Sequence, residues 1–179
     1  MSKLYTDIEN LIRMFGLESK NLSTSITFRK FKPSDQKYVY KMSIDAFEYY
    51  RNLDSGYKKQ TDLEYNSIIK SIEVQSKGKG VDIFIADNSG YAVGFCLVHT
   101  EGNTTVIDDM YVDAKFRGRG IGKGLLETVR SNSLGKSLKL QVFKSNQAAY
   151  KLYKKFGFKL KFIVTDVEND FTIYEMVYI

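Results

Sequence analysis

The sequence predicts an α/β domain in which seven strands are combined with helices in one chain of 179 residues. Three observations support this fold class. Short apolar or alternating stretches, typical of strands, are interleaved with stretches in which apolar residues recur at helical spacing. Hydrophobic residues make up 43% of the chain and proline occurs once, so the chain can bury a sizeable core. A glycine-rich run also separates one predicted strand from the helix that follows it.

Apolar spacing and turn residues predict the elements in chain order. Residues 3–15 carry apolar side chains on one face of a helix, interpreted as an extension over residues 1–24 that precedes the domain at residues 25–179. Apolar runs and alternation predict strands at residues 25–31, 81–86, 91–99, 104–112, 137–143, 158–166 and 171–179. Further helices, marked by an early proline or by glycines at their ends, are predicted at residues 33–50, 61–78, 120–133 and 145–156. The predicted hairpin turns are Asn88-Ser89-Gly90 and Glu168-Asn169-Asp170.

The run RGRGIGK, residues 117–123, follows the strand at 104–112 and opens a helix. Glycines at a helix start leave backbone N–H groups unpaired, and the helix dipole adds partial positive charge there. With two arginines and a lysine, these groups predict a pyrophosphate site. The glycines at 118, 120 and 122 alternate, which does not fit the G-x-G-x-x-G fingerprint of dinucleotide sites. A P-loop does not fit either, because Gly124 and not a hydroxyl residue follows Lys123. The glycines alone would also suit a strand-to-helix loop without a ligand.

A second motif follows the strand at 137–143. Asn146, Ala149, Tyr153, Gly157 and Phe158 have the spacing N-x-x-A-x-x-x-Y-x-x-x-G-F. Together with the glycine-rich run, which matches R/Q-x-x-G-x-G/A, this motif resembles the coenzyme A-binding core of the GNAT N-acetyltransferase superfamily. The close match covers roughly residues 104–160, and the order of the predicted elements agrees over the rest of the chain.

The resemblance implies a GNAT fold: a mixed central sheet of about seven strands, splayed between strands 4 and 5, with flanking helices and an extra N-terminal helix. It implies acetyl transfer from acetyl-CoA to an amine by direct attack in a ternary complex. The pantetheine arm would pair with the bulged strand before the glycine loop. The implied acetyl-CoA-binding residues are Met110, Tyr111, Val112, Arg117, Gly118, Arg119, Gly120, Ile121, Gly122, Lys123, Asn146 and Ala149.

Three residues are candidates for catalysis. Tyr153 matches the family tyrosine that protonates the leaving thiolate, although helical spacing would also suit a core aromatic. Asp108 and Asp109 lie in the stretch IDDMYV, which resembles the L-E-D-L-F/Y-V stretch of spermidine/spermine and thialysine acetyltransferases; Asp108 corresponds to the proposed base there. Adjacent strand residues face opposite sides, so only one should face the acceptor unless the bulge reorients them. Each carboxylate could instead be bonded to nearby backbone or a lysine.

Charge is concentrated around these motifs. Residues 115–161 contain 13 lysines and arginines and one acidic residue, whereas residues 1–114 contain 14 basic and 16 acidic residues. This pattern fits the phosphates of coenzyme A better than nucleic acid, which is not expected to bind; an acidic macromolecular partner stays open.

The single Cys96 is expected to be buried and suits a reducing cytoplasm, and neither a membrane span nor a signal peptide is visible. The single His99 excludes a His-rich metal site, so no metal is expected, and His99 is interpreted as a strand-end residue without a catalytic role.

The acceptor is the least determined feature, because in this family the first two helices and the last hairpin select it. The acidic and tyrosine residues in these segments are Asp45, Glu48, Tyr49, Tyr50, Asp54, Glu64, Asp166, Glu168 and Asp170. They favour a small cationic molecule with a primary amine. The alternatives are a protein N-terminus or lysine as acceptor, or a non-enzymatic acyl-CoA-binding domain. The N-terminal helix would pack on the sheet or on a second subunit, which allows a homodimer.

Overall fold

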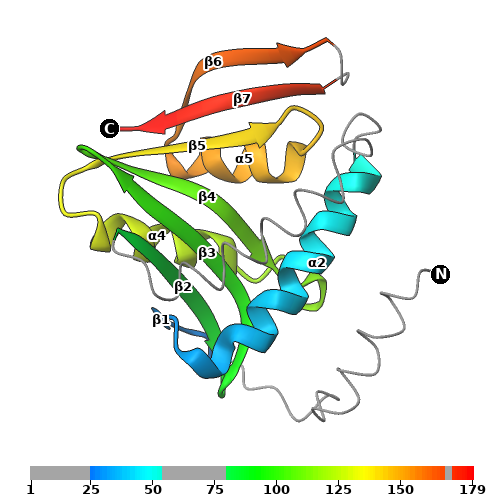
Figure 1. Ribbon diagram of the computed structural model, residues 1–179, viewed down its shortest axis with the longest axis vertical. Coiled ribbons are helices and arrows are strands. Elements are labelled where there is room, and N and C mark those ends of the chain that lie inside the picture. The colour runs from blue at the N-terminus through cyan, green and yellow to red at the C-terminus, as the bar shows by residue number, and fades with distance from the viewer. Residues whose placement is uncertain (1–24, 54–79, 168–170) are drawn as a thin grey trace.

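The computed structural model describes residues 25–53, 80–167 and 171–179. Within these ranges the chain forms one seven-stranded mixed sheet in the order β1-β2-β3-β4-β5-β7-β6 (Figure 1). The strands are β1 (Thr27–Lys30), β2 (Val81–Asn88), β3 (Tyr91–Glu101), β4 (Thr104–Val112), β5 (Ser137–Phe143), β6 (Lys159–Asp166) and β7 (Phe171–Tyr178). The helices are α2 (Gln36–Leu53), α4 (Ile121–Asn132) and α5 (Gln147–Phe156), with short 3-10 turns η1 (Pro33–Asp35) and η3 (Ala114–Phe116). The predicted α/β class, the mixed sheet and the strand number are confirmed.

Element ends differ from the prediction by a few residues. β2 continues through Asn88, and α2 continues to Leu53 after a 3-10 turn that starts at Pro33. The helix expected from residue 145 begins at Gln147, because Asn146 caps it: the Asn146 side chain accepts a hydrogen bond from the Ala149 N–H. The predicted helices at 3–15 and 61–78 and the turn at 168–170 lie outside the described residues.

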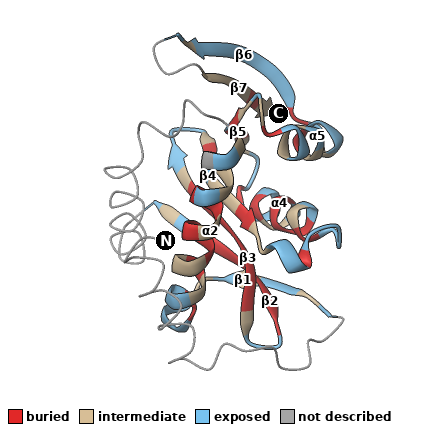
Figure 2. Cartoon of the chain, turned by 90° about the vertical axis from the view of Figure 1, so that its right-hand side faces the viewer, coloured by how far each residue is buried: buried red, intermediate tan, exposed pale blue. Residues whose placement is uncertain are grey.

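Helices cover both faces of the sheet (Figures 1 and 2). α4 and α5 lie on one face, where Leu125, Leu126 and Val129 of α4 join a core with Cys96 and Val98 of β3. α2 lies on the other face, and its core partners include Ile85, Phe95 and Leu97. Cys96 is fully buried, as expected from its apolar surroundings. No helix of the described part of the chain is long and apolar enough to cross a membrane.

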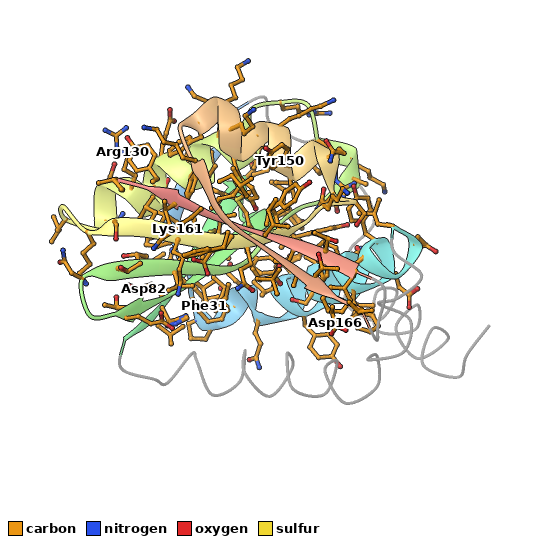
Figure 3. The ribbon with its side chains drawn as sticks, turned by 90° about the horizontal axis from the view of Figure 1, so that it is seen from above. Phe31, Asp82, Arg130, Tyr150, Lys161 and Asp166 are labelled. Atoms are coloured by element: carbon orange, nitrogen blue, oxygen red, sulfur yellow. The ribbon has the colours of Figure 1, made fainter. Side chains whose placement is uncertain are left out.

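The sheet ends in a hairpin that is far more exposed than its centre. β6 forms the edge, pairs only with β7, and is exposed along almost its whole length (Figure 2). Its apolar residues Phe162, Ile163 and Val164 are each more than half exposed. Viewed from above, α5 lies on one side of this hairpin and α2 on the other (Figure 3). Tyr150 of α5 faces the hairpin and its ring lies 5.2 Å from the ring of Tyr174.

A partly buried ion network, with Asp35 fully buried, holds the start of α2 against the sheet. Arg29 of β1 donates two hydrogen bonds to Asp35, at 2.6 and 2.8 Å, and one from Nε to Asp87 of β2 at 2.8 Å. The Lys32 N–H also donates to Asp35 at 2.7 Å. Burial opposes ionisation of Asp35, but the hydrogen bonds from Arg29 and Lys32 outweigh it and lower the Asp35 pKa.

Arg29→Met should destabilise the fold by about 3–5 kcal/mol, because it leaves a buried carboxylate without its cation. A folded-state pKa below the unfolded value gives stability that is present above the unfolded pKa and lost as pH falls through the folded one. The variant should therefore lose part of the acid sensitivity of unfolding. Urea unfolding at pH 7 and pH 3 measures both effects. An unchanged midpoint at pH 7 would contradict the role given to Arg29.

Candidate active site

A bulge interrupts β4 at the two adjacent aspartates. The register of β3 and β4 pairs Val98 with Ile107 and Leu97 with Asp109, so Asp108 is an extra residue without a cross-strand partner. Leu97 belongs to the core on the α2 face, and cross-strand partners share a face. The register therefore assigns Asp109 to the α2 face. Asp108 joins it there, because its carboxyl contacts His99, two residues from Leu97 along β3.

β4 and β5 separate at the same point. They pair in parallel only from Thr104 opposite Ser137 to Ile107 opposite Leu140, while β5 continues to pair with β7 as far as Phe143. Figure 1 shows the two strands diverging from their shared end. The predicted splay between strands 4 and 5 is thus confirmed. Backbone groups from Asp108 to Val112 have no β5 partner in the described sheet, so that edge of β4 can pair with an extended ligand.

The glycine-rich run forms the turn into α4. Gly118 and Gly120 have φ values of 76° and 80°, a region that glycine adopts without strain, and an added Cβ at either would meet nothing within 4 Å. Gly120 is the N-cap of α4 and no side chain caps this end. The first N–H groups of α4 are therefore left for a ligand, with the exposed Arg119 and Lys123 nearby in the chain. Gly122 lies against Leu152 of α5 and Met110 of β4, which brings the loop, the bulged strand and α5 together.

Arg117 has a different role from the other basic residues of the loop. Its guanidinium carbon lies 4.8 Å from the ring centre of Tyr49 on α2 and 5.1 Å from that of Tyr111 on β4. Its Nε donates to the Val112 carbonyl at 3.0 Å. The side chain therefore ties α2 to the end of β4, and a contact of Arg117 with acetyl-CoA stays a prediction.

Two predicted residues of α5 lie near the splay. Asn146 is buried and uses its side-chain oxygen as the helix cap, at 3.2 Å from the Ala149 N–H, so only its amide N–H groups could reach a ligand. Tyr153 is 6% exposed, and its ring packs edge-on against Phe158 at 5.8 Å. Burial, with smaller contributions from Cys96 and Asp109, raises the pKa of its hydroxyl well above the usual value. Tyr153 is thus both a core aromatic and a protonated phenol near the bulge.

Asp108 makes a contact that sequence reasoning missed. Its Oδ2 lies 2.5 Å from His99 Nδ1, and its side chain is 35% exposed. Burial raises the Asp108 pKa, whereas the hydrogen bond from His99 acts to lower it. The two groups are close enough to titrate as a pair. The alternation of β3 and β4 could have suggested this contact, but the exact bulge position decides which residue faces His99.

Asp109 is the more strongly perturbed of the two carboxyls. Burial raises its pKa to about 7, although the Met110 backbone N–H donates a hydrogen bond to it. Its charge is also near enough to raise the pKa values of Cys96 and Tyr153. A carboxyl that titrates near neutral pH can act as a base there, so Asp109 also has the chemistry of a general base.

The residues predicted to select the acceptor are only partly described. Asp54, Glu64, Glu168 and Asp170 lie outside the described residues. On α2, Asp45 pairs with Lys41 at 2.7 Å. Burial, with a smaller contribution from the Asp45 charge, raises the pKa of Tyr111. Tyr50 lies 5.9 Å from Phe143 at the end of β5, and Phe143 lies 5.6 Å from Phe171 of β7. Aromatic side chains from α2, β5 and β7 therefore meet beside the splay, on the α2 face.

Comparison with known proteins agrees with this geometry. Residues 79–160 match the family model of the acetyltransferase (GNAT) domain. PaiA N-acetyltransferase from Thermoplasma acidophilum, solved with coenzyme A, is 21% identical, with 87% of this chain and 100% of that chain covered and a TM-score of 0.66. The ribosomal-protein-S18-alanine N-acetyltransferase from Escherichia coli is 17% identical, with 86% and 92% covered and a TM-score of 0.61. Nourseothricin acetyltransferase is 24% identical, with 55% and 65% covered and a TM-score of 0.52.

At these identities the solved structures show a shared fold. The family model adds the local pattern, because it spans the bulged strand, the glycine-rich loop and α5 in one continuous match. The splayed pair β4–β5, the uncapped start of α4 and the buried tyrosine of α5 all lie inside that match. Residues 79–160 therefore match the acetyltransferase (GNAT) domain, and the described chain shares the fold of GNAT-family acetyltransferases.

Proposed function

We propose that the protein transfers an acetyl group from acetyl-CoA to the primary amine of a small cationic molecule, by direct attack in a ternary complex. The observation that carries the proposal is the β4 bulge. It coincides with the end of β4–β5 pairing and brings two carboxyls to the α2 face, while the uncapped start of α4 and Tyr153 belong to elements on the other face.

The residues of the chain fit acetyl-CoA. The uncapped N–H groups at the start of α4, the open space at Gly118 and Gly120, and the charges of Arg119 and Lys123 suit a pyrophosphate. The unpaired edge of β4 at residues 110–112 suits an extended arm with amide groups. When bound, acetyl-CoA supplies the acetyl group as an activated thioester. A coenzyme A complex of the similar protein from T. acidophilum supports the same ligand here.

The titratable groups suit the two proton transfers that the reaction needs. Most amines are protonated at neutral pH and must lose a proton before they attack a carbonyl. Asp108, at the bulge, is our candidate for this base, with Asp109 as the second candidate. The high pKa of Tyr153 keeps its hydroxyl protonated, so it can donate a proton to a leaving group. Unpaired N–H groups of β4 could stabilise the charge that develops on an attacked carbonyl oxygen.

The acceptor is proposed from the α2 face. The ring of Tyr50, which meets Phe143 beside the splay, suits a cationic amine, whereas the rings of Tyr49 and Tyr111 already hold the Arg117 guanidinium and Asp45 pairs with Lys41. A protein N-terminus or lysine is the second candidate, favoured by the fold shared with the enzyme that acetylates ribosomal protein S18. The basic residues of α5 and β6, Lys151, Lys154, Lys155, Lys159 and Lys161, are all exposed and could hold an acidic target.

Thiol release from acetyl-CoA, followed with a panel of polyamines, other small amines and peptides, tests these proposals. Release with small amines at rates well above those with peptides supports the first proposal, and the reverse order supports protein acetylation. Acetyl-CoA binding without release for any acceptor would favour a non-enzymatic acyl-CoA-binding domain.

Two further proposals concern the setting of the protein. The exposed apolar residues of the edge strand β6 support a homodimer, which light scattering of the purified protein would test. A cytoplasmic location is proposed from the single, buried and reduced Cys96.

A further inference from the structure

Charged side chains of β3, β4 and β5 form a continuous series of contacts beside the bulge. His99 lies between two carboxyls: its Nδ1 is 2.5 Å from Asp108 Oδ2, and its Nε2 is 3.0 Å from Glu101 Oε1. Lys139 Nζ donates to the other oxygen of Glu101 at 3.0 Å. Asp108 stands where β4 leaves β5, while Glu101 stands at the far end of β3 with about half of its side chain exposed. The contacts thus lead from the candidate base toward solvent.

We propose that His99 is a positioning residue for the Asp108 carboxyl and takes up the proton that Asp108 removes from the acceptor amine. This inference rests on the proposed acetyl transfer and deepens it, since it concerns the path of the proton at the same site.

The contacts define where each proton is held. A carboxylate only accepts hydrogen bonds, so when Asp108 and Glu101 are both ionised the two contacts are those of the imidazolium, which donates from Nδ1 to Asp108 and from Nε2 to Glu101. The state that can take up a proton is the neutral ring, in which Nε2–H donates to Glu101 and Nδ1 accepts a hydrogen bond from Asp108 once Asp108 holds the proton of the amine. An N–H bond of the ammonium breaks and an O–H bond forms on Asp108. That proton then moves to Nδ1, which restores the Asp108 carboxylate and gives an imidazolium between two carboxylates. Release of one proton from the ring to water completes the cycle, and no electrons are transferred.

The charges around the ring set the sign of the expected effects. Glu101, and then Asp108, raise the His99 pKa through hydrogen bonds, against the opposing effect of burial. Lys139 on β5 is the cation in contact with Glu101, and Glu175 of β7 acts on Lys139 in turn. From β2, the residue opposite His99 is the apolar Val81. Removing the Glu101 charge should therefore lower the His99 pKa, and removing the Lys139 charge should raise it.

A metal site does not explain this cluster. In residues 25–53, 80–167 and 171–179, no group of three or more His, Cys, Asp and Glu side chains could hold a metal ion.

His99 can be observed directly, because it is the only histidine of the chain. Its imidazole C–H signals in the NMR spectrum, followed from pH 5 to pH 9 without any acceptor, give its pKa in four proteins. The wild type should titrate above the ordinary value of about 6.5. Glu101→Gln and Asp108→Asn should lower the value, and Lys139→Met should raise it. A wild-type value near 6.5 that no variant moves would overturn the contact itself.

The pH dependence of the acetyl-transfer rate then tests whether His99 takes part in proton transfer. The acid side of the kcat/KM profile for acetyl transfer to one fixed amine should move down in pH in Glu101→Gln and up in Lys139→Met, by the same number of pH units as the NMR titration. The pKa of the acceptor amine is the same in every experiment, so it does not contribute to the differences between the variants' profiles. His99→Gln, which can hydrogen-bond but cannot take the proton, should lose about tenfold or more in kcat.

Two failures are distinguishable. If the NMR titration shifts in the variants while the rate profile stays fixed, or if His99→Gln keeps the wild-type kcat, His99 has no part in the proton path and the inference is overturned. If the wild type releases no thiol with any amine or peptide, acetyl transfer itself is wrong and the inference falls with it.

Discussion

Tyr153→Phe should lower kcat for acetyl transfer by about 10²–10⁴-fold, the usual contribution of a general acid. The change removes only the hydroxyl. The ring that packs against Phe158 at 5.8 Å remains, so the core and the fold should be retained. Acetyl-CoA affinity should change little, because the predicted phosphate contacts come from the start of α4. Steady-state thiol release and calorimetric titration with acetyl-CoA measure the two quantities separately.

Tyr150→Phe is the matched control for this prediction. Tyr150 is one turn earlier on α5 and packs on Tyr174 of β7, so its variant loses a hydroxyl from the same helix without touching the splay. It should retain wild-type kcat. Equal turnover of wild type and Tyr153→Phe would leave Tyr153 as a core aromatic only.

Asp108→Asn should lower the rate most at low pH, where the ammonium form of the acceptor dominates and a base is needed most. The amide has nearly the shape of the carboxylate but cannot take a proton. Raising the pH supplies neutral amine directly, so the variant should be partly rescued there. Because burial raises the Asp108 pKa, the wild-type base should also become protonated, and fail, at a higher pH than an ordinary aspartate would. A pH–rate profile with one good acceptor measures both effects.

Asp109→Asn is the comparison that assigns the base. Its carboxyl has a pKa of about 7 in the fold, against about 4 when unfolded, so the folded state binds more protons between these values. Wild-type stability should then fall as pH rises from 4 to 7, and the asparagine variant should lose this dependence.

If Asp109→Asn shows the rescue of rate at high pH and Asp108→Asn does not, Asp109 is the base. If neither does, the amine is deprotonated by another group.

The parts of the site that depend on local sequence could be predicted from it. The glycines of residues 118–122 stand where the chain needs positive φ or an uncapped helix start. Such features are set within a few residues of the chain. The strand at β4 was predicted with its exact limits, Thr104–Val112, because apolar and turn residues mark both ends.

The contacts between strands could not be predicted in the same way. A bulge adds one residue to a strand without changing its composition, so IDDMYV does not reveal that Asp108 is the extra residue. The position of this extra residue decides which aspartate contacts His99, and it places both aspartates on the α2 face of the sheet. His99 was therefore interpreted as a strand-end residue, and its two carboxylate partners emerge only from the register of three strands. Similarly, the contacts of the Arg117 side chain with the rings of Tyr49 and Tyr111 depend on how α2 packs on β4 and could not be predicted from the sequence.

Calorimetric titration of acetyl-CoA into the wild type, Gly120→Glu and Gly135→Glu tests the central claim most directly. Both glycines have φ near 80°, and an added Cβ at either would meet open space, so the two substitutions carry the same backbone strain and charge. Only Gly120 caps the start of α4, where a carboxylate would repel a pyrophosphate. We expect one acetyl-CoA per chain in the wild type and in Gly135→Glu, and no measurable binding in Gly120→Glu. Absence of binding to the wild type, or equal binding to all three proteins, would contradict the account.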